Sequence, residues 1–137
     1  QGAQGEHKEV GEGLRLREAI NLVLSYFKEA KIEILRHITR QGEEYFRLRA
    51  RLDDVMLDIR EYWTGDELQL YGYQLIVKGR LALRYNNAPH HPEVRTFPHH
   101  KHVGESVKEL REPCLRAFLE EAKTLLVGQE RGGPGGT

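Results

Sequence analysis

Apolar and polar side chains alternate along Tyr45-Phe46-Arg47-Leu48-Arg49-Ala50-Arg51-Leu52-Asp53-Asp54-Val55-Met56-Leu57-Asp58-Ile59. Alternation with a period of two is typical of a half-buried β-strand, and the central Asp53-Asp54 pair predicts a two-residue turn between two strands. The resulting register pairs Leu52 with Val55, Ala50 with Leu57, Leu48 with Ile59, Arg49 with Asp58 and Tyr45 with Tyr62. Apolar pairs then share one face and favourable polar pairs share the other, which predicts an antiparallel sheet with one buried face.

Further strands are predicted on both sides of this hairpin. One begins near Lys31, where isoleucines start to alternate with polar residues, and ends at Gln41-Gly42. After a turn at Gly65-Asp66, residues 68–77 and 80–86 form a second hairpin. The sequence therefore predicts about five strands in a meander of hairpins.

A helix is predicted at each end of this meander. Residues 14–30 carry apolar side chains at spacings of three and four. The last helix opens at Glu112-Pro113, because proline is tolerated in a first turn, and its apolar stripe ends near Leu126. Helices at both ends of antiparallel strands predict an α+β fold, in which an N-terminal and a C-terminal helix pack on one face of the sheet.

Length and composition limit the class of protein. A chain of 137 residues predicts a single domain, placed at 14–127 between disordered polar and glycine-rich ends at 1–13 and 128–137. The 21 basic residues are balanced by 21 acidic ones, so any attraction to nucleic acid must come from a local patch. No segment reaches the roughly 18 apolar residues of a membrane span. The single cysteine, Cys114, is predicted to be a small core residue and is compatible with a reducing cytoplasm.

Five of the seven histidines lie between His90 and His102. Because three prolines interrupt this segment, it is predicted to be a stiff loop rather than a helix or a central strand. Between residues 78 and 102 the charged side chains are Lys78, Arg80, Arg84, Arg95 and Lys101 against Glu93 alone. The neutral chain therefore carries a local basic patch at its histidines.

Metal-free cleavage of RNA is the first of four interpretations of this patch. It needs a base for the 2′-hydroxyl proton, an acid for the leaving oxygen and cations for the phosphorane charge. The histidines provide the acid and the base, with Arg84, Arg95 and Lys101 as cations. Tyr85 is suited to bonding a phosphate or stacking on a base.

Metal binding is the second interpretation. Zinc takes three or four ligands from histidine, cysteine and carboxylate. Adjacent histidines rarely face one metal, so His90 or His91 would combine with His100 or His102. The metal-binding alternative is therefore His90, His100 and His102 with zinc or another divalent metal.

Two non-catalytic interpretations complete the four. In one, the basic loop binds phosphate or nucleic acid together with the stripe Arg47, Arg49 and Arg51, which otherwise forms a solvated face paired with Asp58 and Glu61. In the other, the histidines of the loop have structural roles only. His7 and His37, which lie outside the loop, are also assigned structural roles. Trp63, Tyr71 and Tyr73 are assigned to the core or the sheet surface.

The segments Arg84-Tyr85-Asn86-Asn87-Ala88-Pro89-His90-His91-Pro92 and Thr96-Phe97-Pro98-His99-His100-Lys101-His102 closely resemble the motif of the TumE-type toxin family of prokaryotic toxin–antitoxin systems. The resemblance covers roughly 32–126, and the helix before residue 32 looks like an extension. It implies a small cytoplasmic toxin that inhibits translation or cuts RNA and is neutralised by an antitoxin with a helix-turn-helix domain. Asn86 departs from the motif, where aspartate is expected.

The chain is accordingly expected to be a toxin-like, metal-independent ribonuclease, with RNA and a cognate antitoxin as partners, no membrane, and a homodimer as an option. The alternative is a non-catalytic binding domain with a histidine-rich loop. The expected acid and base residues are His90, His91, His99, His100 and His102. The expected substrate-binding residues are Arg84, Tyr85, Asn87, Arg95 and Lys101.

Overall fold

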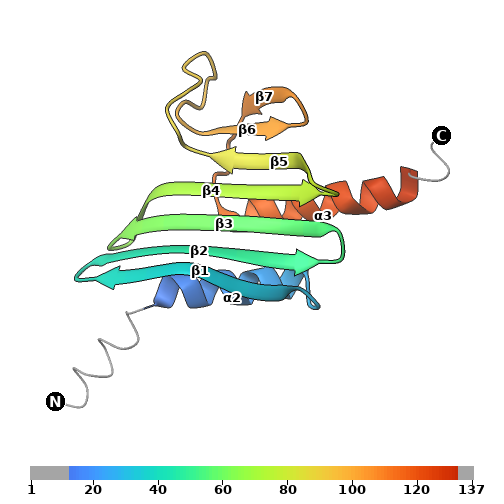
Figure 1. Cartoon of the computed structure of the whole chain (residues 1–137). Coiled ribbons are helices and arrows are strands. Elements are labelled where there is room, and N and C mark those ends of the chain that lie inside the picture. The colour runs from blue at the N-terminus through green and yellow to red at the C-terminus, as the bar shows by residue number, and fades with distance from the viewer. Residues whose placement is uncertain (1–12, 133–137) are drawn as a thin grey trace.

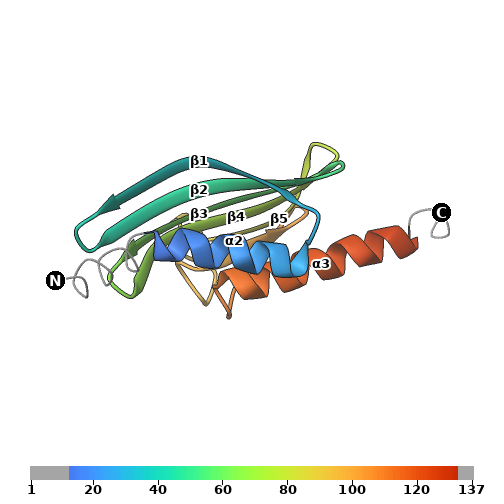
Figure 2. The same ribbon diagram turned by 90° about the horizontal axis from the view of Figure 1, so that it is seen from below.

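A computed structural model describes residues 13–132 as one antiparallel sheet with two helices on the same face (Figures 1 and 2). The seven strands lie in chain order, β1-β2-β3-β4-β5-β6-β7, so every neighbour is joined by a hairpin or a loop. The elements are α2 (Leu14–Tyr26), β1 (Lys31–Arg40), β2 (Glu43–Leu52), β3 (Val55–Thr64), β4 (Glu67–Val77), β5 (Arg80–Asn86), β6 (His100–Val103), β7 (Ser106–Glu109) and α3 (Leu115–Gly132). The predicted α+β class and the flanking helices are confirmed.

The β2–β3 hairpin has the predicted register at every pair. Leu48 lies opposite Ile59 and Arg49 lies opposite Asp58, and the turn places Asp53 at φ 55°. Aspartate tolerates this left-handed conformation better than most residues. The local pattern of alternation was therefore sufficient to define the centre of the sheet.

The expected number of about five strands is too low, because β6 and β7 extend the sheet beyond β5. The prolines that argue against a strand are confined to 89–98, and β6 begins two residues after Pro98. Gly104, at φ 59°, then reverses the chain into β7. The prediction that the whole histidine segment is a loop is thus wrong from His100 onward.

Both helices differ from their predicted bounds. α2 ends at Tyr26 instead of residue 30, because Phe27 leaves the helical region while its N–H still bonds the Val23 carbonyl at 2.8 Å. α3 begins at Leu115 and continues to Gly132, so residues 128–132 are helical where the sequence predicts a disordered tail. The predicted ends at 1–12 and 133–137, including His7, lie outside the described residues. Neither helix of the described chain is long and apolar enough to cross a membrane.

The hydrophobic core lies between the helices and one face of the sheet, which we call the helix side. Its largest fully buried side chains include Phe46, Tyr73 and Phe118, and Tyr71 is also buried, so the two tyrosines are core residues as predicted. Cys114 is exposed, contrary to prediction, because it precedes the first residue of α3 and does not share the helix's apolar face.

Glu44 of β2 anchors the start of α2. Its two carboxylate oxygens accept hydrogen bonds from the backbone N–H groups of Arg15 and Leu16, at 2.9 and 3.1 Å. These N–H groups have no partner within the helix, and the residue before it is glycine, which offers no side-chain cap. His37 bonds the same carboxylate at 2.9 Å, which agrees with its assigned structural role.

The opposite face of the sheet, which we call the outer face, carries the arginine stripe. Asp58 accepts two hydrogen bonds from Arg47, at 3.0 and 2.9 Å, and one from Arg49 at 3.1 Å. Burial raises the pKa of the Asp58 carboxyl, but the two arginines outweigh it and hold the pKa below its usual value. Arg51 makes only a 3.9 Å contact with Glu33. Arg47 and Arg49 are thus paired with Asp58 as predicted. The other predicted partner, Glu61, is instead buried on the helix side, where Tyr73 and Trp63 donate hydrogen bonds to it.

Replacing Asp58 by alanine is expected to lower the free energy of unfolding by about 1–3 kcal/mol, because it leaves two arginines facing each other without a counter-ion. Since the folded-state pKa is lowered, this stabilisation is complete above about pH 4 and disappears as the pH falls through the folded-state pKa. Urea unfolding of both proteins over this range measures it. The control Arg51→Ala should change stability by less than about 0.5 kcal/mol. A cost for Asp58→Ala that is equally small would contradict the role of the ion pairs.

Candidate functional site

Strand alternation divides the predicted site between the two faces of the sheet. β5 and β6 pair Arg84 with His102, Tyr85 with Lys101 and Asn86 with His100. Cross-strand partners share a face, and successive residues point to opposite faces. His100 and His102 therefore lie on the outer face, whereas Tyr85 and Lys101 lie on the helix side.

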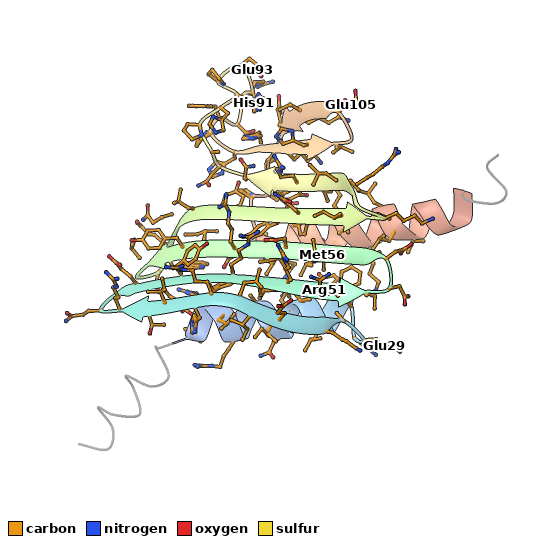
Figure 3. All side chains as sticks on the ribbon, in the orientation of Figure 1. Glu29, Arg51, Met56, His91, Glu93 and Glu105 are labelled. Carbon is orange, nitrogen blue, oxygen red and sulfur yellow. The ribbon has the colours of Figure 1, made fainter. Side chains whose placement is uncertain are left out.

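Three histidines meet on the outer face. The ring centroids of His91 and His100 are 4.8 Å apart, those of His91 and His102 are 5.4 Å apart, and those of His100 and His102 are 5.1 Å apart. One ring nitrogen from each lies within 4.8 Å of the other two. We call these three side chains the histidine cluster. Figure 3 shows His91 on the loop that follows β5, at the end of the sheet remote from Arg51.

Hydrogen bonds outside the cluster orient two of its rings. His100 is 2 % exposed, and its Nδ1–H donates to the Pro98 carbonyl at 3.0 Å, which leaves the lone pair on Nε2. Nδ1 of His91 lies 3.3 Å from the Glu93 carboxylate. Burial lowers the pKa of His102, and the charges of His100, Arg84 and His91 lower it further. The lowered pKa favours the neutral imidazole at His102.

Arg84 lies beside the cluster as the cross-strand neighbour of His102. Its Nε is buried and has no hydrogen-bond partner among the described residues. A buried N–H without an acceptor costs free energy, so this group is suited to an anion that is not part of the chain.

Arg60 brings a second cation toward the cluster. Gly72 lies between Arg60 and Asn86 in the cross-strand row that continues through His100 to Glu109. A Cβ atom at Gly72 would lie 2.8 Å from Nε of Arg60. The Arg60 side chain therefore lies across Gly72, from β3 toward β5. Arg60 was not among the predicted site residues, and the one signal for it in the sequence is Gly72 within a strand, which marks a close approach of another group.

The other predicted histidines lie outside the cluster. His90 is exposed, so His91 takes the place that the metal-binding alternative gave to His90. Nδ1 of His99 is 2.8 Å from the Tyr71 hydroxyl, and the two rings stack with centroids 5.8 Å apart. Burial first, and then the charge of His100, lower the pKa of His99. In each adjacent pair, His90-His91 and His99-His100, the second histidine thus belongs to the cluster and the first does not.

The two asparagines shape the start of the loop. The side chain of Asn87 donates to the Gln69 carbonyl at 2.9 Å and accepts from the Tyr71 N–H at 3.2 Å, so it continues the pairing of β5 with β4. Asn86 accepts from the Ala88 N–H at 3.0 Å. An aspartate at position 86 would make the same bond, because the acceptor is a side-chain oxygen in either case.

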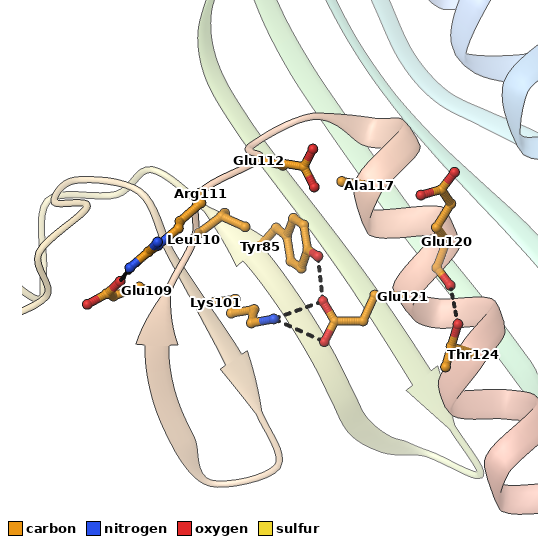
Figure 4. A pocket seen from close by; sticks show the side chains of 10 residues that line it. All are labelled: Tyr85, Lys101, Glu109, Leu110, Arg111, Glu112, Ala117, Glu120, Glu121 and Thr124. Carbon is orange, nitrogen blue, oxygen red and sulfur yellow. Dashed lines mark hydrogen bonds and ion pairs between the residues drawn. The ribbon is translucent and has the colours of Figure 1, made fainter.

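Tyr85 and Lys101 line a separate pocket of about 440 Å³ on the helix side (Figure 4). Both side chains bond Glu121 of α3, and the Lys101 Nζ lies 3.1 and 3.2 Å from its two oxygens. Burial, and then the hydrogen bond to Glu121, raise the pKa of the Tyr85 hydroxyl. These two residues therefore fasten α3 to β5 and β6, and the sheet separates them from the histidine cluster.

Arg95 and His99 line a pocket that is separate from both the histidine cluster and the pocket of Tyr85 and Lys101. Arg95 is largely exposed and contacts Glu109 at 3.9 Å, and the pocket has a volume of about 520 Å³ and is also lined by Thr96 and Arg111. Of the ten predicted site residues, the structure thus brings together Arg84, His91, His100 and His102 on one face.

The family model described as "Toxin TumE" matches residues 21–126. No curated protein and no solved structure matches the chain. The matched region includes all seven strands and begins within α2, so part of the helix that looked like an extension lies inside the family's own boundaries.

Proposed function

The chain belongs to the TumE toxin family, and from this premise we propose that it is the toxin of a toxin–antitoxin system and that it cleaves RNA in the cytoplasm. Membership of a toxin family implies an antitoxin partner. We further propose that the antitoxin carries a helix-turn-helix domain and that the histidine cluster with Arg84 is the site of RNA cleavage.

The unpartnered Nε of Arg84 beside three imidazoles is the observation that supports RNA as the substrate. A phosphodiester oxygen can accept the hydrogen bond for which this N–H has no partner, and cations near the phosphate stabilise the charge that develops during cleavage. The imidazoles are the groups that can accept or donate protons at neutral pH.

The distribution of charge on the outer face agrees with this site. Arg47 and Arg49 share the single carboxylate of Asp58, on strands several positions from β6. Arg84 lies opposite His102, and the Arg60 side chain extends across Gly72 toward β5, so both are placed to attract an RNA phosphate to this part of the outer face. Tyr85 and Lys101 face α3, so we no longer assign them to substrate binding. Arg60 takes their place among the proposed substrate contacts.

The direct test is to incubate the purified full-length chain with labelled RNA and to follow fragments by gel electrophoresis, in parallel with induced expression in bacteria. Defined RNA fragments and growth arrest that co-expressed antitoxin relieves are expected. RNA that is bound but stays intact would instead support the non-catalytic binding alternative. Growth arrest with neither binding nor cleavage of RNA would exclude RNA as the target.

Replacing Arg84 by alanine is expected to weaken RNA binding by about 10–100-fold, because one charge-assisted bond to phosphate contributes roughly 1.5–3 kcal/mol. Titration of labelled RNA at several salt concentrations should also show a smaller salt dependence for the variant. Arg80→Ala is the matched control, because Arg80 is an exposed arginine of the same strand. Equal losses in both variants would show that Arg84 contributes only net charge.

A further inference from the structure

Three histidines from two separate segments share one small volume on the outer face. His100 and His102 alternate on β6, and His91 reaches them from the loop that follows β5. We propose that the histidine cluster binds one divalent transition-metal ion of the zinc class. The proposal rests on this geometry, and it depends on the proposed function only where the metal is assigned to RNA cleavage.

The distances suit a metal better than a phosphate between two imidazoles. Zinc–nitrogen bonds of about 2.0–2.1 Å in a tetrahedral site place ligand nitrogens roughly 3.3 Å apart. The nitrogens of the cluster lie within 4.8 Å of one another, so small side-chain rotations bring them onto one ion. An acid and a base on opposite sides of a phosphodiester require a wider separation, because the phosphate group lies between them.

The surroundings of the rings are those of metal ligands. Imidazoles that bind a metal commonly donate their other N–H to a carbonyl or a carboxylate, which fixes the tautomer and the ring orientation. The His100 Nδ1–H donates to the Pro98 carbonyl, and Nδ1 of His91 faces the Glu93 carboxylate. Nε2 of each ring is thereby left for the ion.

The composition of the cluster indicates a catalytic rather than a structural metal site. Structural zinc sites have four protein ligands, whereas catalytic sites have three and keep one position for water or substrate. Within the described residues, the cluster consists of three histidines with no cysteine or carboxylate among its members. The fourth position would be taken by water or by a phosphate oxygen near Arg84. In this proposal RNA cleavage depends on the ion instead of being metal-independent, and the three imidazoles bind the ion instead of serving as acid and base.

The test uses the full chain without a polyhistidine tag, stripped with EDTA and dialysed. Zinc chloride is then titrated by calorimetry, elemental analysis gives the stoichiometry, and cobalt replaces zinc for absorption spectroscopy. We expect one zinc ion per chain, an absorption spectrum of tetrahedral cobalt, and a higher melting temperature with zinc. Absence of both zinc binding and cobalt binding would overturn the proposal.

Neighbouring histidines provide a matched pair of variants. His91→Ala should weaken zinc binding at least about 100-fold, whereas His90→Ala, which removes an exposed ring one position earlier, should bind as the unmodified chain does. Both changes lie in a loop, and circular dichroism checks that both variants fold. Equal zinc affinity in the two variants would place the metal elsewhere and overturn the proposal.

The metal measurement is independent of RNA, so its failure can be distinguished from failure of the proposed function. If zinc binds at the cluster, and cleavage stops in EDTA and returns with zinc, the result supports both the metal site and the proposed cleavage of RNA. Zinc binding with cleavage that is unaffected by EDTA supports the site and removes its assignment to RNA chemistry.

Discussion

A chain in which His102 is replaced by alanine is expected to cleave RNA about 10²–10⁴-fold more slowly than the unmodified chain, with its fold intact. General acid–base groups contribute factors of this size, and the loss of a ligand from a catalytic metal is expected to cost no less. His102 is half-buried on β6 and faces His91, His100 and Arg84, so its removal affects the cluster rather than the core. Initial rates of cleavage of a labelled RNA measure the effect.

His99→Ala is the informative comparison for this variant. His99 belongs to the same sequence motif, but it stacks on Tyr71 and is not part of the cluster. We expect its cleavage rate to stay within about threefold of the unmodified chain, since it does not touch the proposed site. A large loss with His99→Ala and a small loss with His102→Ala would contradict the assignment of the site to the outer face. Circular dichroism of both variants identifies any loss that results from unfolding.

Phe118→Ala is expected to lower the free energy of unfolding by about 3–5 kcal/mol, the largest stability effect that we predict. The ring is fully buried between α3 and the sheet, with centroids 5.5 Å from Tyr73 and 5.3 Å from Tyr85. Truncation leaves a cavity that these two rings cannot fill, because Tyr85 is also held by Glu121. The melting temperature should fall by roughly 10–20 °C.

Urea unfolding with two controls tests this prediction. Phe118→Leu keeps most of the buried volume and should cost clearly less than the alanine variant. Val127→Ala changes an exposed residue of the same helix and should stay within about 0.5 kcal/mol. If Phe118→Ala costs no more than Val127→Ala, α3 is not packed on the sheet as described.

Neighbouring residues were enough to predict the β2–β3 hairpin at the centre of the sheet, since side-chain direction in a strand follows from parity alone. The Asp53-Asp54 turn joins two alternating segments of equal pattern, so only one register buries all of their apolar residues. The same pattern does not predict β6, because histidine is neither clearly apolar nor clearly polar, and the prolines nearby favour a loop.

The sequence by itself determined that histidines and basic residues are concentrated between β5 and α3, that the sheet is antiparallel, and that the chain resembles the TumE toxins. Only the tertiary structure decided that His91 joins His100 and His102, while His90 and His99 do not. Which histidines join the cluster depends on the path of the loop over the outer face, and long-range packing determines that path. Parity then separates Arg84 from Tyr85 and His100 from Lys101, because adjacent residues of a strand face opposite sides of the sheet.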